Sequence, residues 1–354
     1  MPEPFKPGGA WTALVTPFEA QLRVDIAAFR RLIQFQIAEG IHGVVPAGTT
    51  GESPTLTWDE HILIIESAVH TAANRAGVLA GTGSNSTEEA VSGTRHAVEA
   101  GANAVLLVDC YYNGPSSLEL RTEYYERIMA EVPEIPVVPY IIPGRTGCAL
   151  SAEDLALLHR ADPRRVPAVK QATGDLERMK RDRALSGPGL AIFSGDDDLT
   201  VAMMQDPQIA ACGVISVMSN IAPGAVARMV NWQRAGETSK AGEMGRILAP
   251  LFKLVGCKAK SERRLPGGKV VTVEDRFRNP VPVKTMLAGL GVPVGLCRRP
   301  LGKMTREGVA QCRKALIRVH RAAPEILAPL GQAFGVNIER RLADDSVWAP
   351  VTRE

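Results

Sequence analysis

One lysine stands at the end of an apolar run, where a charged side chain is unusual. Lys170 follows the run VPAV, a composition typical of a strand buried on both faces. Burial disfavours the ammonium form, so a neutral amine becomes available near pH 7. Such an amine attacks a ketone carbon, loses water and leaves an imine, whose enamine can attack an aldehyde without a metal or a cofactor. The alternative is a structural lysine whose head reaches solvent or a carboxylate at the rim.

A tyrosine ends the preceding apolar run. Tyr140 closes PVVPY, and neighbouring strands lie about 4.8 Å apart, so we expect its phenol to meet the lysine amine. A phenol of ordinary acidity moves protons at neutral pH only when nearby hydroxyls relay them. The hydroxyls available for a relay are those of Thr49, Thr50, Tyr111 and Tyr112. The alternative is a tyrosine at a strand end with its hydroxyl in water.

Two loops carry groups that suit a carboxylate. GTTGES, residues 48–53, offers hydroxyls and amides on a backbone that two glycines allow to turn tightly. IPGRTG, residues 142–147, contains Arg145, and a guanidinium holds a carboxylate through two parallel hydrogen bonds. An ordinary surface loop and a surface ion pair are the alternatives.

Eight short apolar runs alternate with amphipathic helical patterns. They begin at Trp11, Gly43, Val78, Ala104, Pro136, Pro167, Ala191 and Cys212. Alternating units of this kind indicate a parallel sheet. Eight of them in about 220 residues predict a closed (β/α)8 TIM barrel with its active site at the C-terminal ends of the strands. A doubly wound open sheet is the competing architecture, but the first turn lacks its G-x-G-x-x-G fingerprint.

The pattern after Ala222 is helical, without further strands between the helices. We predict a barrel domain over residues 1–235 and a C-terminal helical domain over residues 236–354. A basic insert at about residues 257–278 interrupts the helices, and its PGG turn before KVVTV predicts a surface hairpin. A solvated surface loop explains this insert without any function; docking of a partner is the alternative.

The composition narrows the classes of function. The 354 residues are 45% hydrophobic, and a net charge of +3 is too small to indicate nucleic acid or a membrane surface. We find no apolar run of about 18 residues and no signal-peptide core. The cysteines form no CxxC pair and the histidines have no ligand spacing. We therefore predict a cytoplasmic protein without a protein-bound metal.

Six motifs, in this order, resemble those of one known family. They are GTTGES at Gly48, YYN at Tyr111, PGRTG after Tyr140, VKQATG around Lys170, SGDD at Ser194 and GVISV at Gly213. Together they are similar to the dihydrodipicolinate synthase and N-acetylneuraminate lyase superfamily of pyruvate-dependent class I aldolases. ALVTPF near Ala13 and NPVPVK at Asn279 extend the likeness from about Trp11 to Thr305.

The resemblance implies an enzyme that works without a cofactor. It implies that Lys170 forms the Schiff base with pyruvate and that Tyr140 is the general acid and base. Thr49 and Tyr112 match the relay partners of that tyrosine. In the family the second of these is donated across a tight dimer interface, usually within a tetramer, so we expect a homo-oligomer, a tetramer or a dimer.

The resemblance also implies the residues that bind the substrates. Thr50 matches a contact to the pyruvate carboxylate. Gly195 and Ile215 match residues that line the pyruvate pocket through their backbone. Arg145 matches the arginine that positions the carboxylate of aspartate semialdehyde.

The subtype depends on details of these motifs. GTTGE and the dipeptide Arg145–Thr146 favour a dihydrodipicolinate synthase, an enzyme of lysine biosynthesis, over lyases that take a long sugar acid. Departures from the family pattern are Ile141 for asparagine, Gln171 for glutamate, Asp109–Cys110 for Thr–Pro, and Trp58 where lysine-inhibited enzymes often carry histidine. We expect condensation of pyruvate with aspartate semialdehyde. The alternatives are a 2-keto-3-deoxy sugar acid aldolase or dehydratase, an N-acetylneuraminate lyase-like enzyme, and a keto-acid sensor without turnover.

Overall fold

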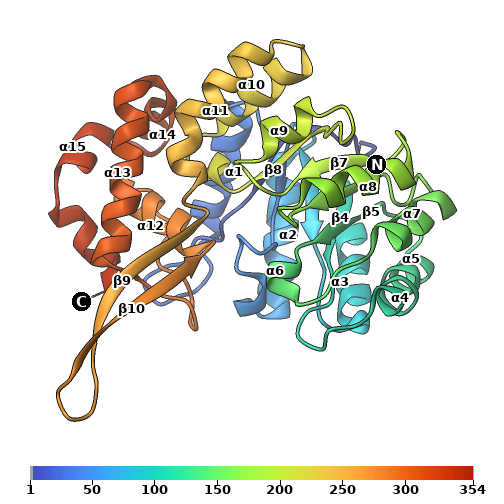
Figure 1. Ribbon diagram of the computed structural model, residues 1–354, viewed down its shortest axis with the longest axis horizontal. Coiled ribbons are helices and arrows are strands. Elements are labelled where there is room, and N and C mark those ends of the chain that lie inside the picture. Colours follow the sequence, from blue (N-terminus) through green and yellow to red (C-terminus); the bar gives the residue numbers. More distant parts are fainter. Residues whose placement is uncertain (1–2, 354) are drawn as a thin grey trace.

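Eight parallel strands close into a barrel in the computed structural model, which describes residues 3–353 (Figure 1). Each strand pairs with the next, and β8 pairs with β1. The strands are β1 (Gly9–Ala13), β2 (Gly43–Val45), β3 (Gly77–Gly81), β4 (Ala104–Val108), β5 (Val137–Ile141), β6 (Ala168–Gln171), β7 (Ala191–Ser194) and β8 (Gly213–Ser216). The predicted TIM barrel is confirmed, and each of the eight apolar runs supplies one strand.

Helices cover the outside of the barrel. They are α1 (Ile26–Ala38), α2 (Trp58–Ala72), α3 (Thr87–Ala100), α4 (Ser117–Glu119), η2 (Leu120–Tyr125), α5 (Glu126–Glu131), α6 (Pro143–Thr146), α7 (Ala152–Ala161), α8 (Leu176–Ser186), α9 (Thr200–Gln205) and α10 (Pro223–Arg234), with the short turns η1 (Ser53–Thr55) and η3 (Met218–Asn220). Thr57 and Ser151 cap α2 and α7 with their side chains. Ser86 precedes α3, but its side chain accepts no capping hydrogen bond. The side chain of the nearby Glu89 accepts a hydrogen bond from the Ser84 hydroxyl.

The apolar side chains of the strands form two cores, one outside the barrel against the helices and one inside it. In a barrel strand, successive side chains point outward to the helices and inward to the barrel axis. In β6, Val169 packs in the outer core and Ala168 in the inner one. Lys170 therefore takes an inward position. The indole of Trp11 fills the opposite end of the interior, where a Cβ on Gly43 or Gly77 would approach within 2.2 Å and 2.5 Å of its ring.

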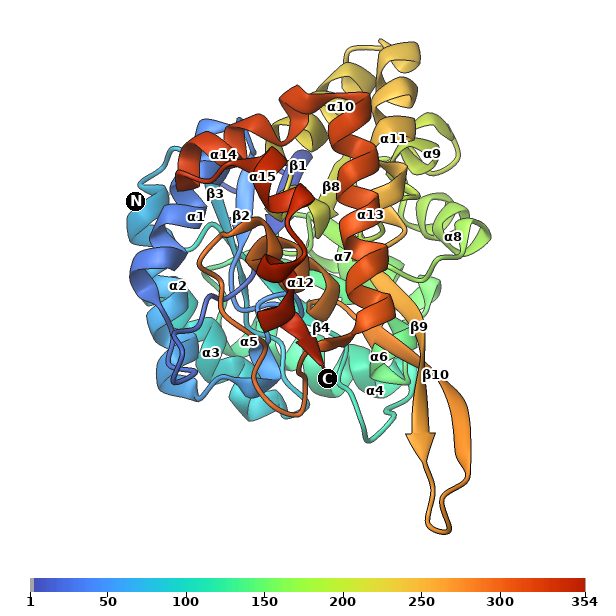
Figure 2. The ribbon, with the colours of Figure 1, turned by 90° about the vertical axis from the view of Figure 1, so that its left-hand side faces the viewer.

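A helical segment follows the barrel and packs against its side (Figure 2). It consists of α11 (Thr238–Phe252), α12 (Val281–Leu290), α13 (Arg306–Ala322), η4 (Pro324–Ile326), α14 (Ala328–Phe334), α15 (Ile338–Ala343) and η5 (Ser346–Val351), with the short strands β11 (Met304–Thr305) and β12 (Thr352–Arg353). Phe334 of α14 meets Phe35 of α1 edge to face, with ring centroids 5.6 Å apart. The division into domains at residue 235 remains a prediction. No helix within residues 3–353 is long and apolar enough to cross a membrane.

The basic insert forms a hairpin that projects from the rest of the molecule (Figures 1 and 2). Strand β9 (Gly256–Arg264) pairs antiparallel with β10 (Val270–Arg278). Gly267 and Gly268 take φ angles of +86° and +85° in the turn, a conformation that glycine adopts without strain. The predicted hairpin is thus observed, and its base leads directly into α12.

Candidate active site

The lysine and the tyrosine meet inside the barrel mouth. The register of β5 and β6 places Tyr140 directly beside Lys170, and both are inward positions near the C-terminal ends of their strands. The Nζ atom of Lys170 lies 4.0 Å from the centroid of the Tyr140 ring. Each side chain is only 5% exposed. The amine is therefore kept away from bulk water and in contact with a phenol.

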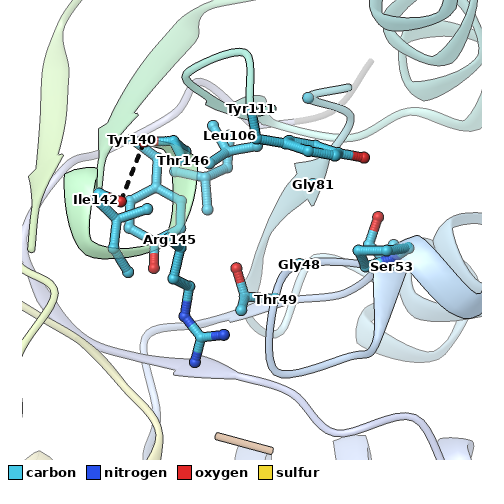
Figure 3. A pocket seen from close by; sticks show the side chains of 14 residues that line it. Gly48, Thr49, Ser53, Gly81, Leu106, Tyr111, Tyr140, Ile142, Arg145 and Thr146 are labelled. Atoms are coloured by element: carbon cyan, nitrogen blue, oxygen red, sulfur yellow. Dashed lines mark hydrogen bonds between the residues drawn. The ribbon is translucent and has the colours of Figure 1, made fainter. Parts of the chain in front are cut away.

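A cavity of about 200 Å³ opens beside this pair (Figure 3). Its wall includes Thr49, Tyr111, Tyr140, Arg145 and backbone of the loops that follow β2 and β3. In Figure 3 the hydroxyls of Tyr140 and Thr49 and the guanidinium of Arg145 point toward the same space. Lys170 is not part of this wall. Tyr140 contacts both the cavity and the amine, so it connects them.

Two of the residues expected to bind pyruvate also lie outside the cavity wall. Ile215 is fully buried in the inner core. Gly195 follows β7, and a Cβ there would lie 3.2 Å from the Cε atom of Lys170 and 2.7 Å from the Cβ atom of Ala172. Because Gly195 has no side chain, the Lys170 side chain has enough space beside it.

We expect Gly195→Ala to slow imine formation at least about tenfold. The added methyl group would lie too close to Ala172 and to the Gln171 carbonyl oxygen and would crowd the Lys170 side chain, and small misplacements of reacting groups are costly. The measurement is the rate at which borohydride traps pyruvate on the intact protein, followed by mass spectrometry. Gly242→Ala is the matched control, since nothing lies within 4 Å of a Cβ at that position in α11. Equal trapping rates for the two variants would contradict this account of Gly195.

The loop after β2 is tied to the segment that follows the hairpin. Thr50 is only 2% exposed, and its Oγ1 accepts a hydrogen bond of 2.9 Å from Nδ2 of Asn279. The hydroxyl of Thr16 donates to the carbonyl oxygen of Gly51 over 2.7 Å. The Thr50 hydroxyl is thus engaged by the protein, and Thr49 is the residue of this pair that faces the cavity.

Arg145 lies in α6 at the outer edge of the cavity. Its Nη2 donates to the carbonyl oxygen of Asn279 over 2.9 Å, which fixes the guanidinium. Although the side chain still reaches solvent, crowding by protein atoms lowers the pKa of Arg145; Tyr140 opposes this shift, and the cations of Arg278 and Arg276 add to it. The arginine thus belongs to a cluster of positive charges.

Tyr112 does not reach the cavity of its own chain. Its side chain is 91% exposed, and its backbone has a φ of +79°, which is unusual for a residue other than glycine. Its neighbour Tyr111 lines the cavity instead. Residue type alone does not distinguish these two tyrosines, and the family resemblance assigns the relay role to Tyr112; the backbone of the loop turns Tyr111 toward the cavity of its own chain.

Asp196, which follows the end of β7, lies near Lys170. Burial and, to a smaller extent, the charge of Asp198 raise the pKa of Asp196 to about 6, and Lys170 opposes the shift. Its Oδ2 atom is buried without a hydrogen-bond partner within the described residues. A carboxyl group with a raised pKa thus lies close to the Lys170 amine. In the sequence, only the SGDD motif could have indicated this aspartate as a residue of the site.

A buried ion pair that the sequence analysis did not predict holds the loop after β2. The Nζ atom of Lys284 lies 2.7 Å from Oε1 of Glu52, with both side chains almost fully buried. Lys284 also donates to the carbonyl oxygens of Thr16 and Leu296 over 3.0 Å and 3.1 Å. The backbone amide of Arg298 donates to Oε2 of Glu52 over 2.8 Å. The pair joins α12 to the loop that carries Thr49.

Two residues that depart from the family pattern, Asp109 and Gln171, make buried hydrogen bonds. Asp109 is fully buried and accepts hydrogen bonds from the Tyr125 hydroxyl (2.6 Å) and the Leu150 amide (3.1 Å), while burial raises its pKa to about 6. Gln171 donates through Nε2 to the buried carboxylate of Asp182. A glutamate at position 171 would place a second carboxylate there, so glutamine suits the local charge.

The geometry can be compared with proteins already known. The model of the Dihydrodipicolinate synthetase family matches residues 6–264. The chain belongs to this family. A 4-hydroxy-tetrahydrodipicolinate synthase of Syntrophobacter fumaroxidans is 40% identical over 309 residues, which are 87% of this chain and 97% of that protein. The synthase of Methanothrix thermoacetophila is 38% identical over 88% of this chain and 96% of its own length.

A solved structure in this family has the same fold. The 4-hydroxy-tetrahydrodipicolinate synthase of Methylacidiphilum fumariolicum SolV superimposes with a TM-score of 0.81 at 32% identity, covering 92% of this chain and 99% of that one. Since 92% coverage is more than residues 1–235 alone can supply, the superposition extends beyond the barrel into the helical segment. Within residues 3–353, no group of three or more potential metal ligands is close enough to hold an ion.

Proposed function

We propose that this chain is a 4-hydroxy-tetrahydrodipicolinate synthase that condenses pyruvate with aspartate semialdehyde through an imine on Lys170. The observation that carries the proposal is the contact between a buried lysine amine and a tyrosine phenol at the mouth of a barrel of this family. The relatives with the same printed name support the choice of substrates. A short cavity of about 200 Å³ with an arginine at its edge suits a small anionic aldehyde.

The chain's own residues supply each step. The Nζ atom of Lys170 attacks C2 of pyruvate, and Tyr140 passes protons so that the carbinolamine oxygen leaves as water. Loss of a proton from C3 of the resulting imine gives the enamine, whose C3 forms a carbon–carbon bond to the aldehyde carbon. The aldehyde oxygen takes up a proton, and attack on C2 by the substrate's own amino group then releases the lysine.

The remaining residues position these reactants. Thr49 faces the cavity and connects the Tyr140 phenol to a proton relay. Arg145 holds the carboxylate of the aldehyde. We infer that Tyr112 completes the relay in a second copy of the chain, because it is exposed and held in a strained backbone conformation. A fully active monomer, detected by light scattering at assay concentration, would contradict this role of Tyr112.

A substrate panel tests the proposed reaction. Purified protein is given pyruvate with aspartate semialdehyde, and separately a set of 2-keto-3-deoxy sugar acids and N-acetylneuraminate. We expect turnover only with aspartate semialdehyde. Turnover of a sugar acid without turnover of aspartate semialdehyde rejects the proposal, and pyruvate binding without any turnover favours a sensor.

We expect Tyr140→Phe to reduce turnover by about 10²- to 10³-fold, because proton transfer by a positioned side chain contributes on this scale. Pyruvate should still bind, since the lysine remains. The matched variant Tyr111→Phe removes another phenol of the cavity wall, and its loss should be at least about tenfold smaller. Steady-state rates of both variants decide the question, and equal losses would remove Tyr140 from the proton-transfer step.

A further inference from the structure

A groove runs from the cavity to the base of the hairpin. It shares Thr49, Pro54 and Arg145 with the cavity, so the two spaces are continuous. Its other wall consists of residues 276–281, at the end of β10 and the start of α12, together with residues 300–303 and Arg353. The insert thus reaches the barrel mouth at its base, although its tip projects far from it (Figure 1).

The lining of this groove is strongly positive. Its cationic side chains are Arg145, Arg276, Arg278, Lys303 and Arg353. The acidic residue in the lining is Glu52, whose carboxylate is already bound by Lys284 and by a backbone amide. Within residues 3–353, none of the three arginines 145, 276 and 278 forms a salt bridge. Asp275 interacts with Arg353, but the described part of the chain supplies no salt-bridge partner to these three arginines.

Local structure directs the arginines toward each other. Arg276 and Arg278 are two residues apart in β10, so they lie on the same face of that strand. Arg278 donates through Nη1 to the carbonyl oxygen of Gly144 over 2.6 Å. Arg145, the next residue after Gly144, is held by the carbonyl oxygen of Asn279. Two guanidinium groups are thus fixed by neutral backbone oxygens, with most of their donors left over.

This arrangement is electrostatically unfavourable without a counter-charge. Like charges repel each other, and the pKa of Arg145, lowered chiefly by burial, is lowered in part by the cations of Arg278 and Arg276. An anion among them relieves the repulsion. A single carboxylate needs only one guanidinium for two parallel hydrogen bonds, so the excess of positive charge suits a ligand with more than one negative charge.

We propose that this groove is a second anion-binding site that takes a small ligand with two or more negative charges on carboxylate or phosphate oxygens. The ligand lies among Arg145, Arg276 and Arg278, and Lys303 and Arg353 line the same groove. The binding itself does not depend on the reaction proposed above. Its consequence does: because Arg145 belongs to both spaces, an anion in the groove competes with the aldehyde and leaves pyruvate unaffected.

Calorimetric titration of the full chain tests the site, with inorganic phosphate and succinate as separate probes at low ionic strength. We expect at least one probe to bind, and its identity distinguishes phosphate from dicarboxylate chemistry. Arg276→Gln/Arg278→Gln should weaken binding about tenfold or more, since each charge-assisted hydrogen bond is lost. Arg264→Gln/Lys269→Gln removes two charges from the tip of the same hairpin and should change the affinity less than about twofold.

A single Arg276→Gln variant checks that any loss does not come from misfolding, because the Arg276 side chain makes no hydrogen bond within residues 3–353. Failure of both probes to bind the unaltered chain, or equal affinities in the groove and tip variants, overturns the proposal. Kinetics supply the second readout: the bound probe should raise the apparent KM for aspartate semialdehyde and not that for pyruvate. If the chain does not act on aspartate semialdehyde, the proposed reaction fails while the titration still decides the anion site.

Discussion

The Lys170→Ala protein is expected to lose at least about 10³-fold in turnover and to acquire no pyruvate adduct under borohydride, because the covalent step has no other nucleophile. The amine is the group within contact of the Tyr140 ring, 4.0 Å from its centroid. A methionine at the same position fills the space without an amine and should be equally inactive. The measurements are the rate of condensation and the mass of the protein after reduction.

The control for this experiment is a lysine away from the barrel mouth. Lys180→Ala removes an amine from the surface of α8, where it pairs with Glu177 over 2.8 Å. We expect its turnover and its trapping to match those of the unaltered chain. A pyruvate adduct on the Lys170→Ala protein, mapped by peptide analysis to another side chain, would contradict the proposed imine.

Replacing Lys284 with methionine is expected to lower the free energy of unfolding by about 3–5 kcal/mol, because removal of one partner leaves a buried charge uncompensated. Glu52 is fully buried and stays close to the barrel mouth. Urea denaturation measures the loss. Activity should fall as well, since the loop that carries Thr49 loses its tie to α12.

A second variant tests whether the loss of stability comes from the unpaired charge of Glu52. Glu52→Gln/Lys284→Met removes both charges, so we expect it to recover a large part of the lost stability. Lys180→Met, which breaks solvent-accessible pairs with Glu177 and Asp206, should change the midpoint of unfolding little. A Lys284→Met protein as stable as the Lys180→Met protein would show that the buried pair contributes nothing to the fold.

The reactive pair could be predicted from sequence because its signals are local. An apolar run that ends in lysine is visible in a few residues, and consecutive barrel strands are neighbours, so Tyr140 and Lys170 were expected to meet. The same reasoning does not separate Tyr111 from Tyr112. Their order in the motif is identical whether the loop turns one or the other toward the cavity, and the backbone conformation decides it.

Contacts between distant segments could not be predicted in the same way. Lys284 and Glu52 are 232 residues apart. Lys284 also ends an apolar run, but nothing near either residue indicates what it pairs with. The hairpin was expected from its turn and its β-branched residues, but the sequence indicated only that it lies on the surface. Only the fold brings its base to the cavity, where Arg278 and Asn279 bind the loops that carry Arg145 and Thr50.

The amino-acid sequence by itself determined the barrel, the position of its mouth and the residue types there that suit imine chemistry. These features depend on hydrophobic periodicity and on residues close together in the chain. The tertiary structure decided which charges are buried, which hydroxyls face the cavity and where positive charge accumulates beside it. Such properties arise because closing the barrel and packing α12 against it remove particular groups from water, and each such group is stable only with the partner that the fold supplies.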